Sequence, residues 1–287
     1  MQIVTDSGTD SMLAGGEGLG IHVVPLNVSL DDKTYREGLD IKTEAFYDLL
    51  DNSQNLPTTS QPSPGDFAEV YRTLAKKDKD ILSIHISSGL SGTVNSAVIA
   101  VGMVPEANIT VVDTKTLAAG AGWQVVAAAK AVAAGWAKEK ILSLLDTIRN
   151  SSHSVFTLSE LKYLIHGGRI SHIKGLLASI LDIKPIIGVN REKGNYEQLA
   201  QARSFNNALN SLVDVMSKRI GTGEKLVAQA AHAMNPEGMQ QLQEKINAVF
   251  DCQWLPTGPM SLVLGAHTGR SMVGVCYAPA KVMAQVP

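Results

Sequence analysis

Short apolar runs alternate with segments of helical periodicity over the first 150 residues. Strands are predicted over residues 2–6, 21–30, 34–37, 81–86 and 109–113, helices over 43–50, 64–76, 93–101 and 116–134, and a loop over 52–62. The helix after Ser63 has a serine cap, a proline at its first position and an acid in its first turn. Strands that alternate with helices predict a mostly parallel sheet covered on both faces.

The order of elements changes after a helix predicted over residues 138–149. Gly194 and Asn195 form a tight turn that predicts an antiparallel hairpin between the strands on either side. The predicted strands are 154–158, 184–189, 196–203, 226–231, 252–255 and 273–277, with a short helix ending at 165 and helices at 205–220 and 236–250. The sequence therefore predicts an α/β protein of two domains. These are a three-layer α/β/α domain over residues 1–150 and an α+β domain over residues 151–287.

Composition and charge narrow the class of protein. The chain has 287 residues, of which 45% are hydrophobic, 18% charged and 5% aromatic, with a net charge of −2. This hydrophobic fraction excludes intrinsic disorder, and so small a net charge provides no overall field to hold nucleic acid. No uncharged apolar run approaches the roughly 18 residues of a membrane span, and no signal peptide opens the sequence. We expect a soluble, cytoplasmic protein without an integral membrane segment.

The common catalytic signatures are absent from the sequence. It has no phosphate-binding P-loop, no dinucleotide fingerprint, no zinc-protease motif and no G-x-S-x-G elbow. Cys252 and Cys276 are too few for a disulfide framework or a four-ligand zinc site, and we expect them to be reduced thiols. The seven histidines do not pair with acids at metal-ligand spacing, so no metal and no cofactor is expected.

One segment rich in serine and glycine is a candidate anion site. It reads Ser87-Ser88-Gly89-Leu90-Ser91-Gly92-Thr93 and joins a predicted strand to a predicted helix. Ligands of open α/β sheets bind beyond the carboxyl ends of strands, where a helix N-terminus favours an anion. The hydroxyls add donors, and the glycines let an anion approach the backbone. The alternative is a plain capping loop, which explains one serine and one glycine.

Two shorter clusters and one basic segment are weaker candidates. Thr59 and Ser60 are not needed to cap the helix that follows, although a polar loop also explains them. His267 is predicted to lie in a glycine-bounded loop, where a lone histidine is more often structural than a ligand. The segment between Lys162 and Lys193 is locally positive, which suits either a solvated face or a docking surface for an acidic or phosphate group. Its basic residues are Lys162, His166, Arg169, His172, Lys174, Lys184, Arg191 and Lys193.

Taken together, these segments resemble the DegV family, the fatty-acid-binding subunits of bacterial fatty acid kinase. Seven matching pieces occur in the family's order between residues 4 and 269. They are Val4-Thr5-Asp6-Ser7, Tyr35-Arg36-Glu37-Gly38-Leu39-Asp40, Thr59-Ser60-Gln61-Pro62-Ser63, the serine-glycine segment above, Gly167-Gly168-Arg169-Ile170, Ile183-Lys184-Pro185-Ile186 and His267-Thr268-Gly269.

The resemblance implies a carrier rather than an enzyme. One long-chain fatty acid, such as palmitate, stearate or oleate, would lie in an apolar tunnel between the two domains. A separate ATP-dependent kinase subunit would convert the bound acid to an acyl phosphate for phospholipid metabolism. The residues implied to hold the carboxylate are Thr59, Ser91 and His267, with Ser60, Gly92 and Thr93 beside them, and Arg169 and Arg203 are implied at the partner or phosphate end.

Two other functions and one departure from the family stay open. Ser91 could act as the nucleophile of an acyl transferase or hydrolase with His267 as its base, or the helix N-terminus could sense a phosphate ester. Arg270, Ser271 and Met272 stand where the family usually has Pro-Gly. An added cation at this place would either strengthen anion binding or alter the contact with the partner.

Overall fold

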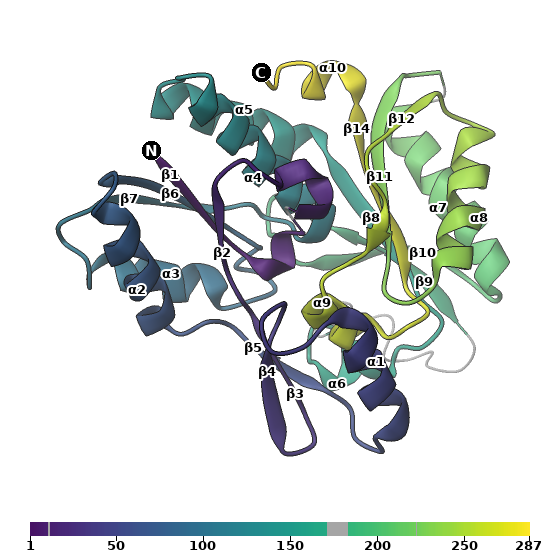
Figure 1. Ribbon diagram of the computed structural model, residues 1–287. Coiled ribbons are helices and arrows are strands. Elements are labelled where there is room, and N and C mark those ends of the chain that lie inside the picture. The colour runs from purple at the N-terminus through teal and green to yellow at the C-terminus, as the bar shows by residue number, and fades with distance from the viewer. Residues whose placement is uncertain (11, 171–182, 222) are drawn as a thin grey trace.

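The structure is a computed structural model, which describes residues 1–10, 12–170, 183–221 and 223–287. Within these residues the chain forms a four-stranded, a seven-stranded and a three-stranded sheet. Figure 1 shows the four-stranded sheet on the left, the seven-stranded sheet on the right and the three-stranded sheet below, with helices around and between them.

The four-stranded sheet is parallel throughout. Its order is β2 (Ile21–Val24), β1 (Gln2–Asp6), β6 (Asp80–His85) and β7 (Asn108–Asp113), and its helices are α2 (Pro64–Ala75), α3 (Thr93–Val101) and α4 (Ala118–Ala133). Val4 and Ile81 pack against α2 and α3. Their neighbours on the same strands, Ile3 and Leu82, pack against α4 on the opposite face. Because side chains alternate along a strand, both faces are apolar, and the predicted parallel sheet with helices on both faces is confirmed.

The seven-stranded sheet is mixed. Its order is β10 (Tyr196–Ala202), β9 (Lys184–Val189), β8 (His153–Thr157), β14 (Val273–Pro279), β11 (Leu226–His232) and β12 (Cys252–Trp254), and β13 (Gly258–Pro259) pairs with β11. The pairs from β10 to β11 are antiparallel, and β12 and β13 run parallel to β11. Helices α7 (Phe205–Ile220) and α8 (Pro236–Asn247) cover one face, and α4 and α5 (Lys138–Ser151) contact the other. The predicted hairpin at Gly194 is confirmed.

Helix α4 lies between the two large sheets. It contacts β1 and β6 on one side and β8 and β14 on the other. Twelve of its sixteen residues are buried, and most of these are alanine or glycine. Small side chains on both faces of this helix let two sheets approach it closely.

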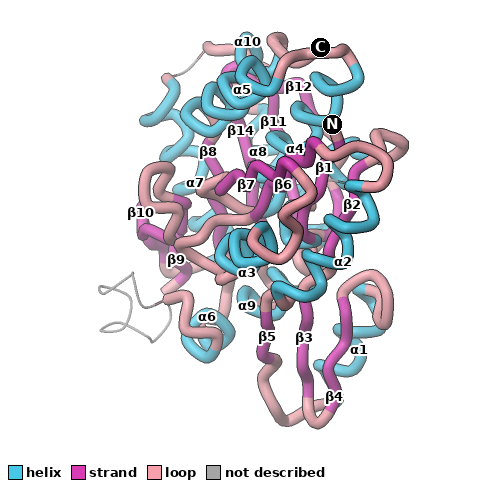
Figure 2. The backbone as a smooth tube through the Cα atoms, turned by 90° about the vertical axis from the view of Figure 1, so that its left-hand side faces the viewer, coloured by secondary structure: helices cyan, strands magenta, loops and turns pink. Residues whose placement is uncertain are grey.

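The three-stranded antiparallel sheet was expected only in part: the strand predicted over residues 34–37 does pair with the residues before it, whereas the third strand was not predicted. It consists of β4 (Lys33–Arg36), β3 (Asn27–Leu30) and β5 (Thr58–Ser60), and α1 (Thr43–Asn52) lies beside it (Figure 2). The single strand predicted over residues 21–30 is therefore wrong, because β2 and β3 belong to different sheets. Pro25 separates them: it has no N–H for a sheet, and the N–H of Leu26 donates to Oγ of Ser7 at 3.0 Å. The prediction of a loop over residues 52–62 is also wrong in part, because residues 58–60 form β5.

The glycine-bounded loop predicted around His267 is helix α9 (Leu262–Thr268). The glycines that favoured a loop have other roles. Gly269 ends the helix with a positive φ of 73°. Gly265 lies within the helix, and only glycine fits at this position because a Cβ would overlap the hydroxyl of Tyr47. The remaining short elements are the turns Ser7–Thr9 and Met12–Gly16 and the helices α6 (Lys162–His166) and α10 (Ala280–Met283).

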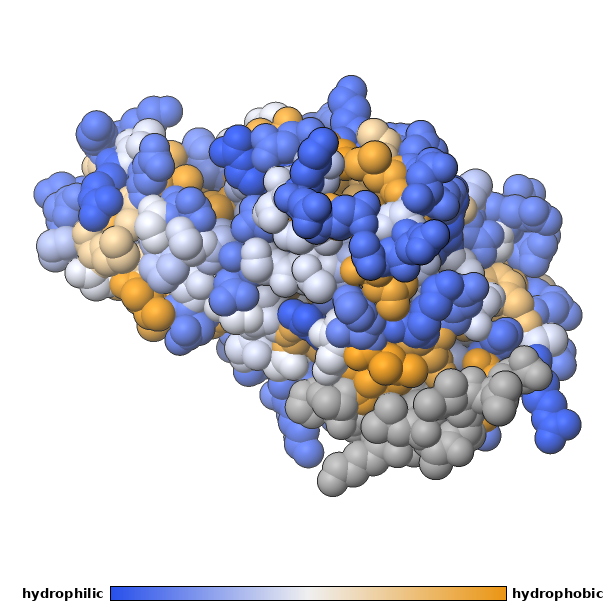
Figure 3. All heavy atoms as spheres, turned by 90° about the horizontal axis from the view of Figure 1, so that it is seen from below, coloured by the Kyte–Doolittle hydropathy of each residue, from blue (hydrophilic) through white to orange (hydrophobic). Residues whose placement is uncertain are grey.

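The surface is mostly hydrophilic, with small apolar areas. Seen from below, charged and polar residues cover most of the described surface, and one larger apolar area is visible (Figure 3). Large apolar side chains that are exposed include Leu39, Leu49 in α1 and Ile165 in α6. Among the described helices, none has both the length and the apolar composition to cross a membrane.

Candidate functional site

Four distant parts of the chain bring polar side chains to one pocket. Thr59 and Ser60 come from β5, Ser91 from the loop between β6 and α3, Arg169 from the turn after α6, and His267 from α9. Helix α9 packs against β3, β5 and α6, so it connects His267 with the strand of Thr59 and Ser60 and with the helix that precedes Arg169. Five of the eight residues singled out from the sequence therefore line the same pocket.

Thr59 and His267 form the centre of this pocket. Thr59 Oγ1 and His267 Nε2 share a hydrogen bond of 2.6 Å between residues 208 positions apart in the sequence. Burial lowers the pKa of His267 to about 3, and the nearby charges of Arg169 and His166 act in the same direction. The imidazole is therefore neutral near pH 7. On its other side Gly167 lies so close to Nδ1 that any side chain at position 167 would overlap it.

Ser91 is held at the pocket by its own loop. Its Oγ lies 2.8 Å from Oγ1 of Thr93, which is fully buried at the start of α3. A Cβ at Gly92 would lie 2.9 Å from the side-chain amide of Gln61, so the glycine lets the loop pack against the residues that follow β5. Gln61 lines the pocket, whereas Gly92 and Thr93 support it from behind. Gln61 follows Ser60 in the same motif, but its residue type alone did not identify it as a site residue.

The other serines of this loop have structural roles. Ser88 Oγ donates to Asp113, and Ser87 Oγ accepts from the N–H of Gly89 at 3.1 Å. Ser87 also packs against Gly194, whose φ of 70° and lack of a side chain allow the hairpin turn to approach. Only Ser91 among the three serines lines the pocket. The loop therefore forms one side of the site, while its other serines hold neighbouring segments in place.

Arg169 lies in the pocket, and Arg203 does not. The Arg169 guanidinium is half-buried and donates to the carbonyls of Leu90 at 3.3 Å and Gly167 at 2.6 Å. Burial lowers its pKa. Among the described residues that line the pocket none is acidic, and Arg169 forms no ion pair with a described carboxylate. Arg203 is exposed just after β10. His172 and Lys174 of the basic segment lie outside the described residues.

Arg270 does not reach the pocket either. It forms an ion pair with Asp51 and lies over the ring of Tyr47, 5.7 Å from the ring centre. Its charge is therefore compensated on the outer side of α1 and α9. The structure does not support a direct role of this added cation in holding an anion at His267.

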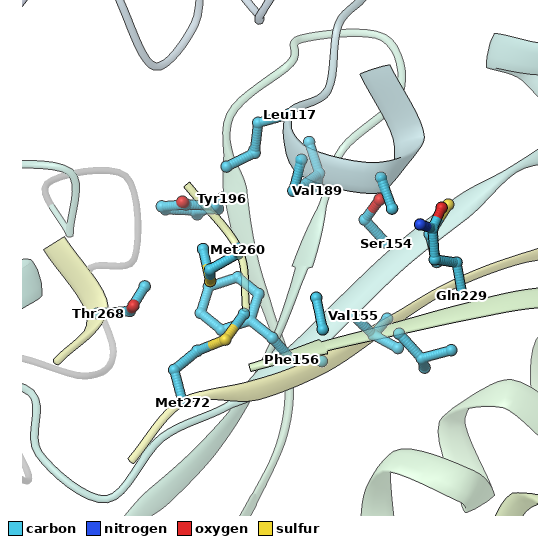
Figure 4. A pocket seen from close by; sticks show the side chains of 16 residues that line it. Leu117, Ser154, Val155, Phe156, Val189, Tyr196, Gln229, Met260, Thr268 and Met272 are labelled. Carbon is cyan, nitrogen blue, oxygen red and sulfur yellow. The ribbon is translucent and has the colours of Figure 1, made fainter. Parts of the chain in front are cut away.

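An apolar cavity lies next to the polar pocket, and Figure 4 shows the side chains that line it. Leu117 and Tyr196 line both, so they form the boundary between the two. The floor of the cavity is the seven-stranded sheet, and its roof is the start of α4. In Figure 4, Tyr196 and Thr268 lie at one end and Gln229 at the other. The lining includes Leu117, Ala118, Ala119, Ser154, Val155, Phe156, Val189, Tyr196, Gln229, Ala231, Met260, Met272, Gly274 and Cys276.

Most of these cavity residues were not identified from the sequence. They come mainly from α4, β8, β9, β10, β11 and β14, and no local pattern distinguishes a side chain facing a cavity from one facing another side chain. Gly274 has the most specific role, because a Cβ there would lie 2.8 Å from Cβ of Phe156. Because glycine has no side chain, position 274 leaves room in the cavity above the sheet.

The site suits an amphipathic anion. Hydroxyls and Arg169 surround the polar end, where none of the described lining residues is acidic, and aliphatic, aromatic and thioether groups surround the other. The geometry gives less support to a serine nucleophile. Among the described contacts, Nε2 of His267 bonds to Thr59 and Ser91 bonds to Thr93, so Ser91 has no base at hydrogen-bond distance.

A family model described as an uncharacterised protein of the DegV family matches residues 1–280. A DegV domain-containing protein of Staphylococcus aureus (strain MRSA252) is 34% identical over 273 residues, which cover 95% of this chain and 96% of the relative. Among solved structures, a fatty-acid-binding DegV family protein from Thermus thermophilus has a TM-score of 0.86 and 30% identity, covering 97% of this chain and 99% of its own. DegV of Bacillus subtilis, a fatty acid binding protein, has a TM-score of 0.86 and 28% identity, covering 96% of this chain and 98% of its own.

Proposed function

Because the chain belongs to the DegV family, we propose that it binds one long-chain fatty acid and presents the carboxylate to a separate ATP-dependent kinase subunit. The observation that carries this proposal is that the polar pocket, with no acid among its described lining residues, shares Leu117 and Tyr196 with the apolar cavity. Two related proteins of known structure are fatty-acid-binding proteins, which supports the same ligand class here.

The polar pocket has donors for a carboxylate. A buried carboxylate is costly unless hydrogen bonds replace its water, and charge-assisted bonds are the strongest replacements. The neutral imidazole of His267 can donate through Nε2 to Thr59, which leaves the hydroxyl proton of Thr59 for the ligand. Ser91 and Arg169 supply further donors. A carboxylate held in this way keeps an oxygen lone pair free to attack a phosphate.

The cavity supplies the affinity for the chain. Each buried methylene contributes about 0.8 kcal/mol, so a long acyl chain gains on the order of 10 kcal/mol before the cost of association. The cavity volume is about 50 Å³, so an acyl chain enters only if side chains move. Met260 and Met272 line the cavity, and unbranched thioether side chains are suited to such movement.

Mass spectrometry of an organic extract tests the ligand. The purified protein should release about one long-chain fatty acid per chain, and delipidated protein should rebind palmitate or oleate. Absence of fatty acid together with no rebinding would sink the proposal. Thermal stabilisation by sugar phosphates alone would favour a phosphate-ester sensor. Covalent labelling of Ser91 by a fluorophosphonate probe would favour an acyl transferase.

Reconstitution tests the presentation to a kinase. The loaded protein, ATP and the ATP-dependent subunit of a bacterial fatty acid kinase should yield an acyl phosphate, trapped by hydroxylamine as the hydroxamate. The exposed basic residues Arg203, Arg191 and Lys193 and the exposed Ile165 offer contacts for such a partner. If the loaded protein gives no hydroxamate while a known carrier does, the kinase part of the proposal fails and the carrier part stands.

A further inference from the structure

A second apolar pocket lies farther along α4, at the end remote from His267. Its volume is about 470 Å³, far larger than that of the internal cavity. Its lining includes Trp123, Val126, Ala127 and Lys130 of α4, Val227 of β11, Gln253 and Leu255, and Ala280, Lys281 and Met283 of α10. None of the residues singled out from the sequence lines it.

The two cavities follow one another along the same elements. Along β11, Ala231 and Gln229 line the internal cavity, and Val227 lines the second pocket. These residues share one face of the strand, because alternate side chains point the same way. Along α4, Ala119 lines the first cavity and Trp123, one turn later, lines the second. Neighbouring positions along a strand face are about 7 Å apart, so one layer of side chains separates the cavities.

Trp123 and Gln229 form that layer. Both are buried, and Nε1 of Trp123 donates to Oε1 of Gln229 at 2.6 Å. The amide nitrogen of Gln229 donates to the carbonyls of Leu13 at 3.1 Å and Pro256 at 2.8 Å. A glutamine with every amide group paired in the interior is held in place, since moving it leaves several buried polar groups unsatisfied. It differs in this from Met260 and Met272, which can move aside.

We propose that the Trp123–Gln229 pair sets the upper limit of acyl-chain length, and that the pocket between α4 and α10 would receive the end of a longer chain if the pair were opened. The inference rests on the proposed binding of a fatty acid in the internal cavity. A chain whose carboxylate lies near Thr59 and His267 passes Tyr196, follows the face of β11 and meets Gln229 with its methyl end. A longer chain would have to break the three hydrogen bonds of Gln229.

A chain-length competition tests this proposal. Delipidated protein is given an equimolar mixture of saturated acids from palmitate to lignocerate, and the bound acids are extracted and quantified by mass spectrometry. We expect retention by the natural chain to fall sharply beyond one length. Gln229→Ala should raise the ratio of bound lignocerate to palmitate at least tenfold. Gln253→Ala is the matched control, because Gln253 is exposed and lines only the second pocket.

Two further variants keep the test decisive. Trp123→Leu removes the other member of the Trp123–Gln229 pair. It replaces Gln229→Ala in the experiment if circular dichroism shows that Gln229→Ala does not fold. Ala231→Leu fills the cavity before the layer and should shift the profile toward shorter chains. An unchanged chain-length profile in a folded Gln229→Ala or Trp123→Leu variant overturns the inference, and so does an unchanged profile in Ala231→Leu. If the natural chain binds no acid of any length, the proposed function itself fails.

Discussion

Thr59 shows how much a single hydroxyl contributes to this site. It is the middle residue of a three-residue strand, opposite the buried Val28, and its side chain meets an imidazole from the far end of the chain. Its neighbour Thr58 is exposed and pairs with Ser29. Two adjacent threonines therefore have different roles, because successive side chains of a strand point to opposite faces.

Thr59→Val should weaken fatty-acid binding by about tenfold to a hundredfold, since a hydrogen bond to a charged group contributes roughly 1.5–3 kcal/mol. The variant keeps the shape of the side chain and removes the donor. The affinity is measured by displacement of a fluorescent fatty acid from delipidated protein. Thr58→Val is the control and should bind as the natural chain does; equal affinities of both variants would contradict the role of Thr59.

The position of Arg169 changes the expectation for this residue. The resemblance placed it with Arg203 at the partner end, yet it lines the pocket beside His267. Arg169→Ala should therefore lower fatty-acid retention, and Arg203→Ala should leave it unchanged. Extraction and mass spectrometry of both variants decide between the two arrangements. Full lipid content in Arg169→Ala would contradict a role in holding the fatty acid and would favour a role of Arg169 in contacting the partner.

His267 makes the folding stability depend on pH. Its pKa is about 3 in the folded chain and about 6.5 in the unfolded chain, so the unfolded state binds more protons between these values. The free energy of unfolding should therefore fall as the pH drops below 6.5, by about 2 kcal/mol at pH 5 from this residue. Burial also lowers the pKa of His153, to about 4, which adds to the same trend.

Urea unfolding at pH 7 and pH 5 measures this dependence. His267→Gln should retain part of the pH dependence, because His153 remains, but should lose less stability on acidification than the natural chain. The same loss in both proteins would mean that the pKa of His267 does not differ between the folded and the unfolded chain.

At the scale of elements, helix α9 is what assembles the site. It joins the three-stranded sheet to the seven-stranded sheet, and its N-terminal end is held by Glu37, which accepts from Oγ of Ser261 at 2.9 Å and from the N–H of Leu262 at 2.6 Å. Gly265 lets the helix approach α1 so closely that the hydroxyl of Tyr47 faces its backbone. Small changes in this contact should therefore move His267.

Gly265→Ala should lower the free energy of unfolding by about 1–3 kcal/mol, because its methyl group would overlap the hydroxyl of Tyr47. Tyr47→Phe alone should cost little, since that hydroxyl is buried without a partner among the described residues. The double variant should recover part of the loss, as the ring carbon behind the hydroxyl would still lie 3.1 Å from the new methyl group. Additive effects in this double-mutant cycle would contradict the contact.

At the scale of the whole molecule, the candidate ligand site is where the parts of the chain meet. The pocket and the cavity take residues from β5, the loop after β6, α4, α9 and the seven-stranded sheet. A ligand that touches all of them binds the folded chain and not the unfolded one, so it stabilises the fold by mass action.

Delipidated protein should therefore unfold at a lower temperature than loaded protein. At roughly 100 times Kd of palmitate the stabilisation should be about 2.7 kcal/mol. Scanning calorimetry with and without palmitate measures the shift, and Thr59→Val should reduce it at the same palmitate concentration. No shift in the natural chain would contradict binding of the acid to the folded state.

Local sequence signals predicted most of the elements and several of the site residues. The capping residues at Ser63, the turn at Gly194 and the apolar periodicity of residues 205–220 act within a few positions, and the structure has the expected helix, hairpin and helix there. Thr59, Ser91 and His267 were singled out because their residue types suit an anion. Their meeting in one pocket came only from the family resemblance.

The tertiary structure decided what no local pattern predicts. Pro25 separates two strands into different sheets, α9 replaces a loop, and Arg169 lies in the pocket while Arg203 does not. The Trp123–Gln229 pair has no sequence signature at all. The physical reason is range: helix caps and turns are set by neighbouring residues, whereas the bonds from Thr59 to His267 and from Trp123 to Gln229 join residues 208 and 106 positions apart.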